Sequence, residues 1–173
     1  MGAGLPKIPG EFHKIPEAKV AIIGARWHSD CIEAMIDRAH KELLAIDVKP
    51  ENITVHRVPG SLEIPFAARV LFEADPELDT VIAFGVVLEG ITSHDESVLF
   101  TVVNGLSEIT RQFGKPIINE VIGVKSIEDA HKRSGDNNQN KGVEAVYAAS
   151  ELLHWWRGVA PKKSSSPPGA GRT

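Results

Sequence analysis

Cysteine, tyrosine and methionine are almost absent from this sequence, which contains one, one and two of them. The single cysteine, Cys31, excludes an internal disulfide framework and a zinc site built on several cysteines. We therefore expect a reducing, cytoplasmic compartment. Excess positive charge is missing too. The formal net charge of −4 gives no reason to expect a nucleic-acid or anionic-membrane partner.

Long apolar runs and several familiar motifs are also missing. No stretch reaches the length of about 20 apolar residues that a membrane-spanning helix needs, and the first residues do not resemble a signal peptide. Neither GxxxxGK(S/T) nor GxGxxG is present, and the GxSxG of serine hydrolases is absent. The histidines His28, His40 and His131 show no spacing typical of metal ligands, so we expect no metal and no cofactor.

What the sequence does contain is an alternation of short apolar runs with longer amphipathic stretches. This order predicts an α/β fold in which helices cover both faces of a four-stranded parallel sheet, a three-layer α/β/α sandwich. The expected strands are 19–25, 53–58, 80–88 and 116–124. The expected helices run from an N-cap at Ser29 to about 44, from an N-cap at Ser61 to about 73, and over 94–113, 126–134 and 141–157.

The two ends of the chain differ in composition from this middle part. Residues 1–17 are rich in glycine and proline, which predicts an irregular arm. Residues 159–173 are rich in serine, proline and glycine and show no apolar periodicity, which predicts a disordered tail. One domain is therefore expected over residues 18–158.

Ligands of parallel sheets bind at the carboxyl ends of the strands, so the loops there are the candidate sites. The loop before His94 contains Gly90, which tolerates unusual backbone angles, and the following helix begins with free N–H groups that favour an anion. The positive end of that helix favours the neutral form of His94, a good general base. The alternative is an ordinary helix start with a surface histidine.

The other loops carry candidates with two interpretations each. Trp27 either stacks on a planar heterocycle or packs at the rim of the sheet. Glu63 either accepts hydrogen bonds from a polyol or is an acid favoured by a helix N-terminus. Arg133 and Lys141 either hold a phosphate or belong to a solvated charged loop.

Taken together, these loops resemble those of the 6,7-dimethyl-8-ribityllumazine synthase family over about residues 18–157. The matching segments are GARWHSD, VPGSLEIPFAA, GVVLEGITSH, PIINEVIGV, EDAHKRSG and NKGVEA. The combination of VPG-x-x-EIP with G-x-x-x-x-G-x-T-x-H is specific. The Arg-Trp-His run is similar to a divergent branch of the family known in some alpha-proteobacteria.

The resemblance implies a flavodoxin-like fold and an enzyme of riboflavin biosynthesis that needs no metal or redox cofactor. It condenses 5-amino-6-(D-ribitylamino)uracil with 3,4-dihydroxy-2-butanone 4-phosphate to give 6,7-dimethyl-8-ribityllumazine. The implied assembly is a pentamer, or a multiple of pentamers, with each active site between adjacent subunits.

By matching position, His94 is the implied proton-transfer residue and Arg133 the implied phosphate-binding residue. Trp27 matches the aromatic residue that stacks on the pyrimidine, and Lys141 matches the lysine of the NKG segment. The implied substrate-binding residues are Trp27, Ser61, Leu62, Glu63, Val87, Leu88, Glu89, Gly90, Ile91, Thr92, Asn119, Arg133 and Lys141.

Two of these positions depart from the family pattern. Glu89 stands where most members carry arginine, which weakens phosphate binding if the carboxylate points inward. Asn119 stands where the family often has a phenylalanine that enters the neighbouring subunit's pocket. The alternative functions are therefore a catalytically weak riboflavin- or lumazine-binding paralogue and a shell-forming scaffold.

Overall fold

The computed structural model describes residues 8–91 and 93–160. It contains one sheet of four parallel strands in the order β2-β1-β3-β4. The strands are β1 (Val20–Ala25), β2 (Ile53–Val58), β3 (Thr80–Leu88) and β4 (Ile117–Val124). The predicted strands and their parallel arrangement are confirmed.

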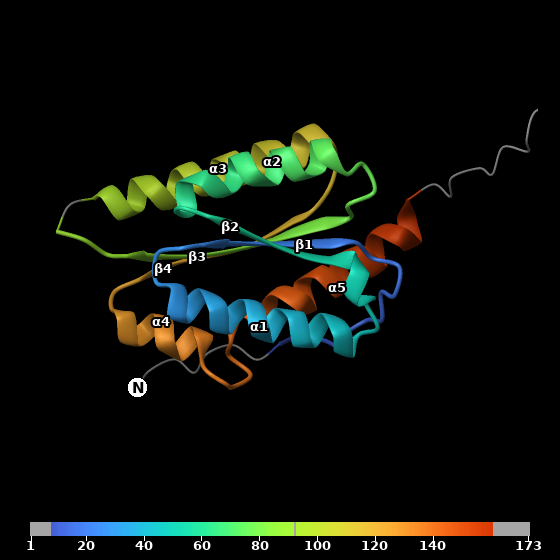
Figure 1. Ribbon diagram of the computed structural model, residues 1–173, viewed down its shortest axis with the longest axis horizontal. Helices are drawn as coiled ribbons and strands as arrows, with labels where there is room; N and C mark the ends of the chain where they lie inside the picture. The colour runs from blue at the N-terminus through green and yellow to red at the C-terminus, as the bar shows by residue number, and fades with distance from the viewer. Residues whose placement is uncertain (1–7, 92, 161–173) are drawn as a thin grey trace, which may run out of the picture.

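Helices cover both faces of the sheet, which gives the predicted three-layer α/β/α, flavodoxin-like fold. In Figure 1, α2 and α3 lie above the sheet, and α1, α4 and α5 lie below it. Two single 3₁₀ turns, η1 and η2, precede β2 and α2. The helical segments are α1 (Ser29–Ala45), η1 (Pro50–Asn52), η2 (Ser61–Glu63), α2 (Ile64–Ala74), α3 (His94–Phe113), α4 (Ile127–Ser134) and α5 (Lys141–Val159).

The two central strands are apolar because both of their faces are covered. Successive side chains of a strand point to opposite faces, so β1 and β3 each contribute to two cores. Ile22 and Phe84 pack in the core on the α1 and α5 side. Ile23 and Ala83 pack in the core on the α2 and α3 side. The edge strands β2 and β4 carry polar residues, since part of their surface stays open.

Two of the predicted helix starts are wrong. Helix α1 begins at Ser29 itself, and the capping position is His28, in a left-handed conformation with φ 58° and ψ 47°. Ser61 starts the turn η2, and α2 begins only at Ile64. Pro65 favours this later start, because proline fits the first turn of a helix, where its missing N–H is not needed. Neither serine side chain caps its helix.

The described part of the N-terminal arm, residues 8–17, forms no helix or strand but is attached to the domain. Ile15 is buried and donates its N–H to the carbonyl of Ile46, and Phe12 contacts the ring of Tyr147 on α5 edge to face. The rest of the predicted arm and residues 161–173 of the predicted tail lie outside the described residues. Val159 of that tail is the last residue of α5. None of the described helices is long and apolar enough to span a membrane.

Candidate active site

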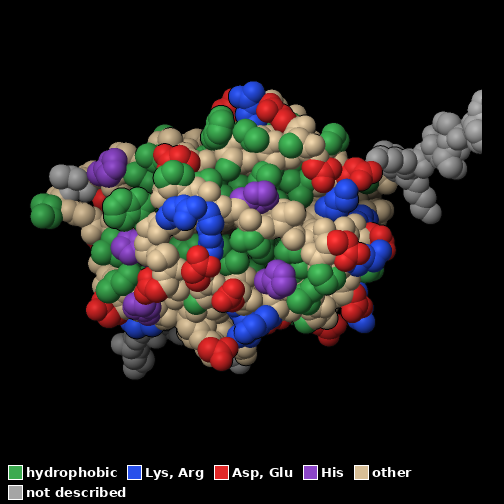
Figure 2. Space-filling model, viewed as in Figure 1, with side chains coloured by type: hydrophobic (Ala, Val, Ile, Leu, Met, Phe, Trp, Pro, Cys, Tyr) green, Lys and Arg blue, Asp and Glu red, His purple; other side chains and the backbone are tan. Residues whose placement is uncertain are grey.

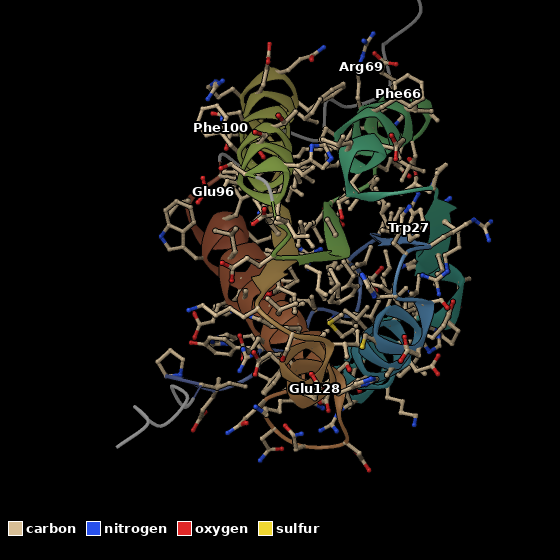
Figure 3. The ribbon with its side chains drawn as sticks, turned by 90° about the vertical axis from the view of Figure 1, so that its left-hand side faces the viewer. Trp27, Phe66, Arg69, Glu96, Phe100 and Glu128 are labelled. Carbon is tan, nitrogen blue, oxygen red and sulfur yellow. The ribbon has the colours of Figure 1, made fainter. Side chains whose placement is uncertain are left out.

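Trp27 and Glu63 both lie beside Gly60 at the carboxyl end of the sheet. Figure 3 looks at this end of the molecule, with Trp27 beside β2. The Trp27 side chain is 72% exposed. A β-carbon on Gly60 would lie 3.0 Å from Oε2 of Glu63 and 3.5 Å from Cδ1 of Trp27. The absence of a side chain at Gly60 therefore lets an exposed indole face and a carboxylate lie together, where a flat polar ligand can use both.

The neighbouring residues Ser61 and Leu62 differ in what they can offer a ligand. Ser61 is buried, and its Oγ lies 2.5 Å from where a β-carbon on Gly85 of β3 would be. Its hydroxyl therefore packs against the sheet. Leu62 is exposed beside Glu63. The accessible side chains of this segment are those of Leu62 and Glu63.

The loop after β3 extends from the sheet and is largely exposed. Val87 is half-buried, and Leu88, Glu89, Gly90 and Ile91 are exposed. The N–H of Glu89 donates to the carbonyl of Val124 at 2.8 Å, which joins the end of β3 to the end of β4. Thr92 lies outside the described residues. Among the described glycines, Gly114 is the one with a positive φ, of 62°. Gly90 therefore does not adopt the left-handed conformation that glycine allows.

His94 is exposed at the first position of α3, as the sequence predicts. The next residue, Asp95, turns its carboxylate back toward the loop, with Oδ1 3.5 Å from the N–H of Gly90. Glu96 adds a second acid to the first turn. These carboxylates already complement the positive end of α3, so they compete with an anion for that position.

Four charged side chains gather between β4, α4 and α5, and we call them the ionic cluster: Glu120, Arg133, Lys141 and Glu144. Nζ of Lys141 lies 2.9 Å from Oε2 of Glu120 and 2.6 Å from Oε2 of Glu144. Nη2 of Arg133 donates a hydrogen bond to Oε1 of Glu144. The four side chains are only 11–25% exposed, so Arg133 and Lys141 do not belong to a solvated loop.

The cluster is balanced in charge, which makes its burial tolerable. Burial raises the pKa of Glu120; Lys141 and Arg133 oppose this rise, and Glu144 adds to it. Nη1 of Arg133 is buried and has no hydrogen-bond partner among the described residues. The guanidinium therefore keeps a donor that an additional anion can use.

Glu120 and Glu144 were not predicted as site residues from the sequence. Glu144 follows Lys141 by three positions on a helix, a spacing at which opposite charges meet. Glu120 is the charged residue in β4, whose other residues are apolar except for Asn119. A buried charge inside a strand needs a partner, and that requirement was the signal available in the sequence.

The predicted residues form two separate groups in this chain. Trp27 and Glu63 meet near β1 and β2, whereas Arg133 and Lys141 lie in the ionic cluster beneath β4. Asn119 is exposed on β4, and its Oδ1 accepts a hydrogen bond from the N–H of Val121. Over residues 8–91 and 93–160, no hydrogen bond or ion pair joins the two groups.

Comparison with known proteins supports the family resemblance of these loops. The sequence profile of the family described as 6,7-dimethyl-8-ribityllumazine synthase matches residues 17–157. A protein of that name from Xanthomonas oryzae is 36% identical over 139 residues, covering 80% of this chain and 90% of its own. A protein of the same name from Parabacteroides distasonis is 34% identical and covers 84% of this chain and 92% of its own. One from Stenotrophomonas maltophilia is 33% identical and covers 84% of this chain and 93% of its own. The predicted likeness to an alpha-proteobacterial branch stays a prediction.

Proposed function

Since the chain belongs to the 6,7-dimethyl-8-ribityllumazine synthase family, we propose that it forms 6,7-dimethyl-8-ribityllumazine in riboflavin biosynthesis. The substrates are 5-amino-6-(D-ribitylamino)uracil and 3,4-dihydroxy-2-butanone 4-phosphate. The amine adds to the ketone and loses water to form a Schiff base, phosphate leaves, and the ring closes with loss of a second water. The family match over nearly the whole domain carries this proposal, since it includes every loop at the carboxyl end of the sheet.

The group around Gly60 is suited to bind the pyrimidine substrate. The exposed face of Trp27 stacks on the ring, and Glu63 accepts hydrogen bonds from the ribityl hydroxyls. Leu62 provides an apolar wall beside them, and Ser61 contributes through its backbone. Val87 and Leu88 offer backbone groups to the ring edge where β3 ends.

The ionic cluster is suited to bind the phosphate of the second substrate. Arg133 holds an unused buried donor and Lys141 adds a positive charge close to it. Glu144 already bonds both cations, so phosphate has to compete with that carboxylate. Gly90 and Ile91, on the exposed loop after β3, belong to the phosphate-side segment of the family match, as does Thr92 by its sequence position. Glu89, on the same loop, opposes the anion, and His94 moves protons between the reacting groups.

Because one chain keeps the two groups apart, we assign the complete site to the boundary between two subunits of a cytoplasmic pentamer. Apolar side chains on α2 and α3 support an assembly. Phe66 and Phe100 are 71% and 72% exposed, and Figure 3 shows them projecting from α2 and α3. Asn119 is exposed on the edge strand β4, and this exposure supports its contact with a neighbouring subunit.

The decisive experiment measures lumazine formation by the purified protein with both substrates. We expect product from the wild type. The rate should fall about a hundredfold or more in His94→Ala and Arg133→Ala, because each removes a side chain that contacts the reacting groups. Glu128→Gln is the matched control, since Glu128 is exposed on α4 and Figure 3 shows it away from Trp27. No product together with tight riboflavin binding would support the paralogue instead. An intact assembly that binds neither substrate nor riboflavin would support the scaffold.

Mixing the two inactive variants tests whether the site is shared. After joint unfolding and refolding at equal amounts, about a quarter of the subunit boundaries pair an intact His94 with an intact Arg133 of the neighbour. We expect activity to return to about that fraction of the wild type. If both residues served one site within the same chain, no mixture would recover activity.

A further inference from the structure

A second cluster of chemically active side chains joins the start of α1 to α4. Asp30 and Cys31 lie in the first turn of α1, and His131 lies on α4. One nitrogen, oxygen or sulfur atom from each lies within 4.8 Å of the others. We propose that these three side chains bind a divalent metal ion of the zinc class.

The distances suit a tetrahedral ion. Sγ of Cys31 lies 3.5 Å from Nδ1 of His131. Zinc–sulfur and zinc–nitrogen bonds of about 2.3 and 2.0 Å at a tetrahedral angle place two such ligand atoms about 3.5 Å apart. The pair is therefore already at the separation that a shared zinc ion requires.

Asp30 lies close enough to supply a third ligand once its carboxylate rotates around the imidazole. Its Oδ2 lies 3.5 Å from Nε2 of His131, whereas the ion would sit on the Nδ1 side of the ring. The Asp30 and His131 side chains are 63% and 54% exposed, so both can adjust at little cost. Water completes the coordination, as in zinc sites that have three protein ligands.

The surroundings of the thiol favour a metal ligand over a covalent nucleophile. Cys31 is fully buried, so a substrate cannot reach its sulfur without displacing neighbouring residues. An ion reaches it from the side of the two exposed partners. Burial and the charge of Asp30 raise the pKa of the Cys31 thiol, and Ser134 opposes this.

The bound ion would hold together two elements that carry active-site residues. Helix α1 starts two residues after Trp27, and α4 carries Arg133 two residues after His131. The expected role is therefore to fix helix positions, with no part in the chemistry. Cys31 and His131 are 100 positions apart, which is why their sequence spacing suggested no metal.

The test uses the tag-free full chain and Zn²⁺ alone, measured by equilibrium dialysis with elemental analysis. We expect about one ion per chain in the wild type. Cys31→Ser and His131→Gln should bind at least tenfold more weakly, and Asp30→Asn should show a smaller loss. His40→Gln is the matched control, because His40 lies on the same helix outside the cluster. Titration with Co²⁺ should give thiolate-to-cobalt absorption in the wild type and the control but not in Cys31→Ser.

Thermal unfolding with and without Zn²⁺ separates loss of the site from loss of the fold. The wild type and His40→Gln should melt at a higher temperature with the ion, whereas folded Cys31→Ser and His131→Gln should not. Absence of Zn²⁺ binding in the wild type, or equal affinity in Cys31→Ser, would overturn the proposal. His131 would then simply bridge a thiol and a carboxylate. Lumazine formation is measured separately, so neither result depends on the proposed enzyme activity.

Discussion

Glu120 points from β4 into the layer beneath the sheet, where water cannot solvate a carboxylate fully. Nζ of Lys141 lies 2.9 Å from Oε2 of Glu120 and supplies the compensating charge. Lys141 also bonds Glu144, so neither carboxylate has this cation to itself. Desolvation outweighs the attraction, which is why the pKa of Glu120 lies above its ordinary value.

The pH dependence of stability should reveal this group. With a raised pKa, the folded chain binds more protons than the unfolded chain, so the stability that Glu120 contributes is complete below about pH 4.5 and is lost as the pH rises through the folded pKa. The free energy of unfolding of the wild type should therefore fall relative to that of Glu120→Gln over this window. Urea denaturation of both proteins between about pH 4 and pH 8 measures the difference. A difference that stays constant with pH would contradict this account.

At the scale of whole elements, α5 packs closely against the backbone of α1 at Gly142. A β-carbon there would contact the carbonyl oxygen of Met35 and lie 2.7 Å from the backbone nitrogen of Ala39. Both contacts are backbone atoms of α1, which cannot move without shifting the helix. Gly142 therefore sets how closely α5 packs onto α1 and the sheet.

Gly142→Ala should cost about 3 kcal/mol of unfolding free energy, because overpacking would push the two helices apart. Gly158→Ala on the same helix is the control, since no described residue lies within 4 Å of where its β-carbon would be. Alanine favours helix over glycine, so the control should gain up to about 0.5 kcal/mol. Chemical denaturation of the three proteins measures both effects. Equal stabilities would mean that α5 can shift freely.

Sequence patterns predicted the elements well but their junctions poorly. The short apolar runs of β1 and β3 and the helical stripe of α3 are strong local signals, and the bounds of these elements agree with the prediction to within one residue. Ser29 and Ser61 failed as caps because local preference yields to the geometry of the preceding turn. The ionic cluster was only half predicted, since its carboxylates come from β4 and α5, whose packing no local pattern specifies.

At the scale of the molecule, the surface has no large region of one charge on the face that Figure 2 shows, where acidic, basic and hydrophobic side chains are interspersed. The apolar residues of α2 and α3 matter more for assembly. Besides Phe66 and Phe100, Val70 and Val103 are exposed on these helices. Phe100 and Phe66 project to opposite sides of this layer in Figure 3, and large exposed apolar side chains of this kind favour contacts with other subunits.

Phe100→Asp should therefore dissociate the proposed pentamer, because a carboxylate would be buried in an apolar contact. Size-exclusion chromatography with light scattering measures the mass of the assembly, and activity should fall with it. Val159→Asp is the matched control, since Val159 is exposed at the end of α5, on the other side of the sheet. A full-sized assembly of Phe100→Asp would place the interface elsewhere.

The strand order also has a consequence for the growing chain on the ribosome. Each strand pairs with one made earlier, β2 and β3 with β1 and β4 with β3, so the sheet can extend in the order of synthesis. The layer of α2 and α3 is complete once β4 has been made. The opposite core still lacks Ala145, Val146, Ala149 and Leu153, which come from α5. Until that last helix leaves the ribosome, the part of this face that α5 covers stays exposed beside α1, and chaperones can bind to it.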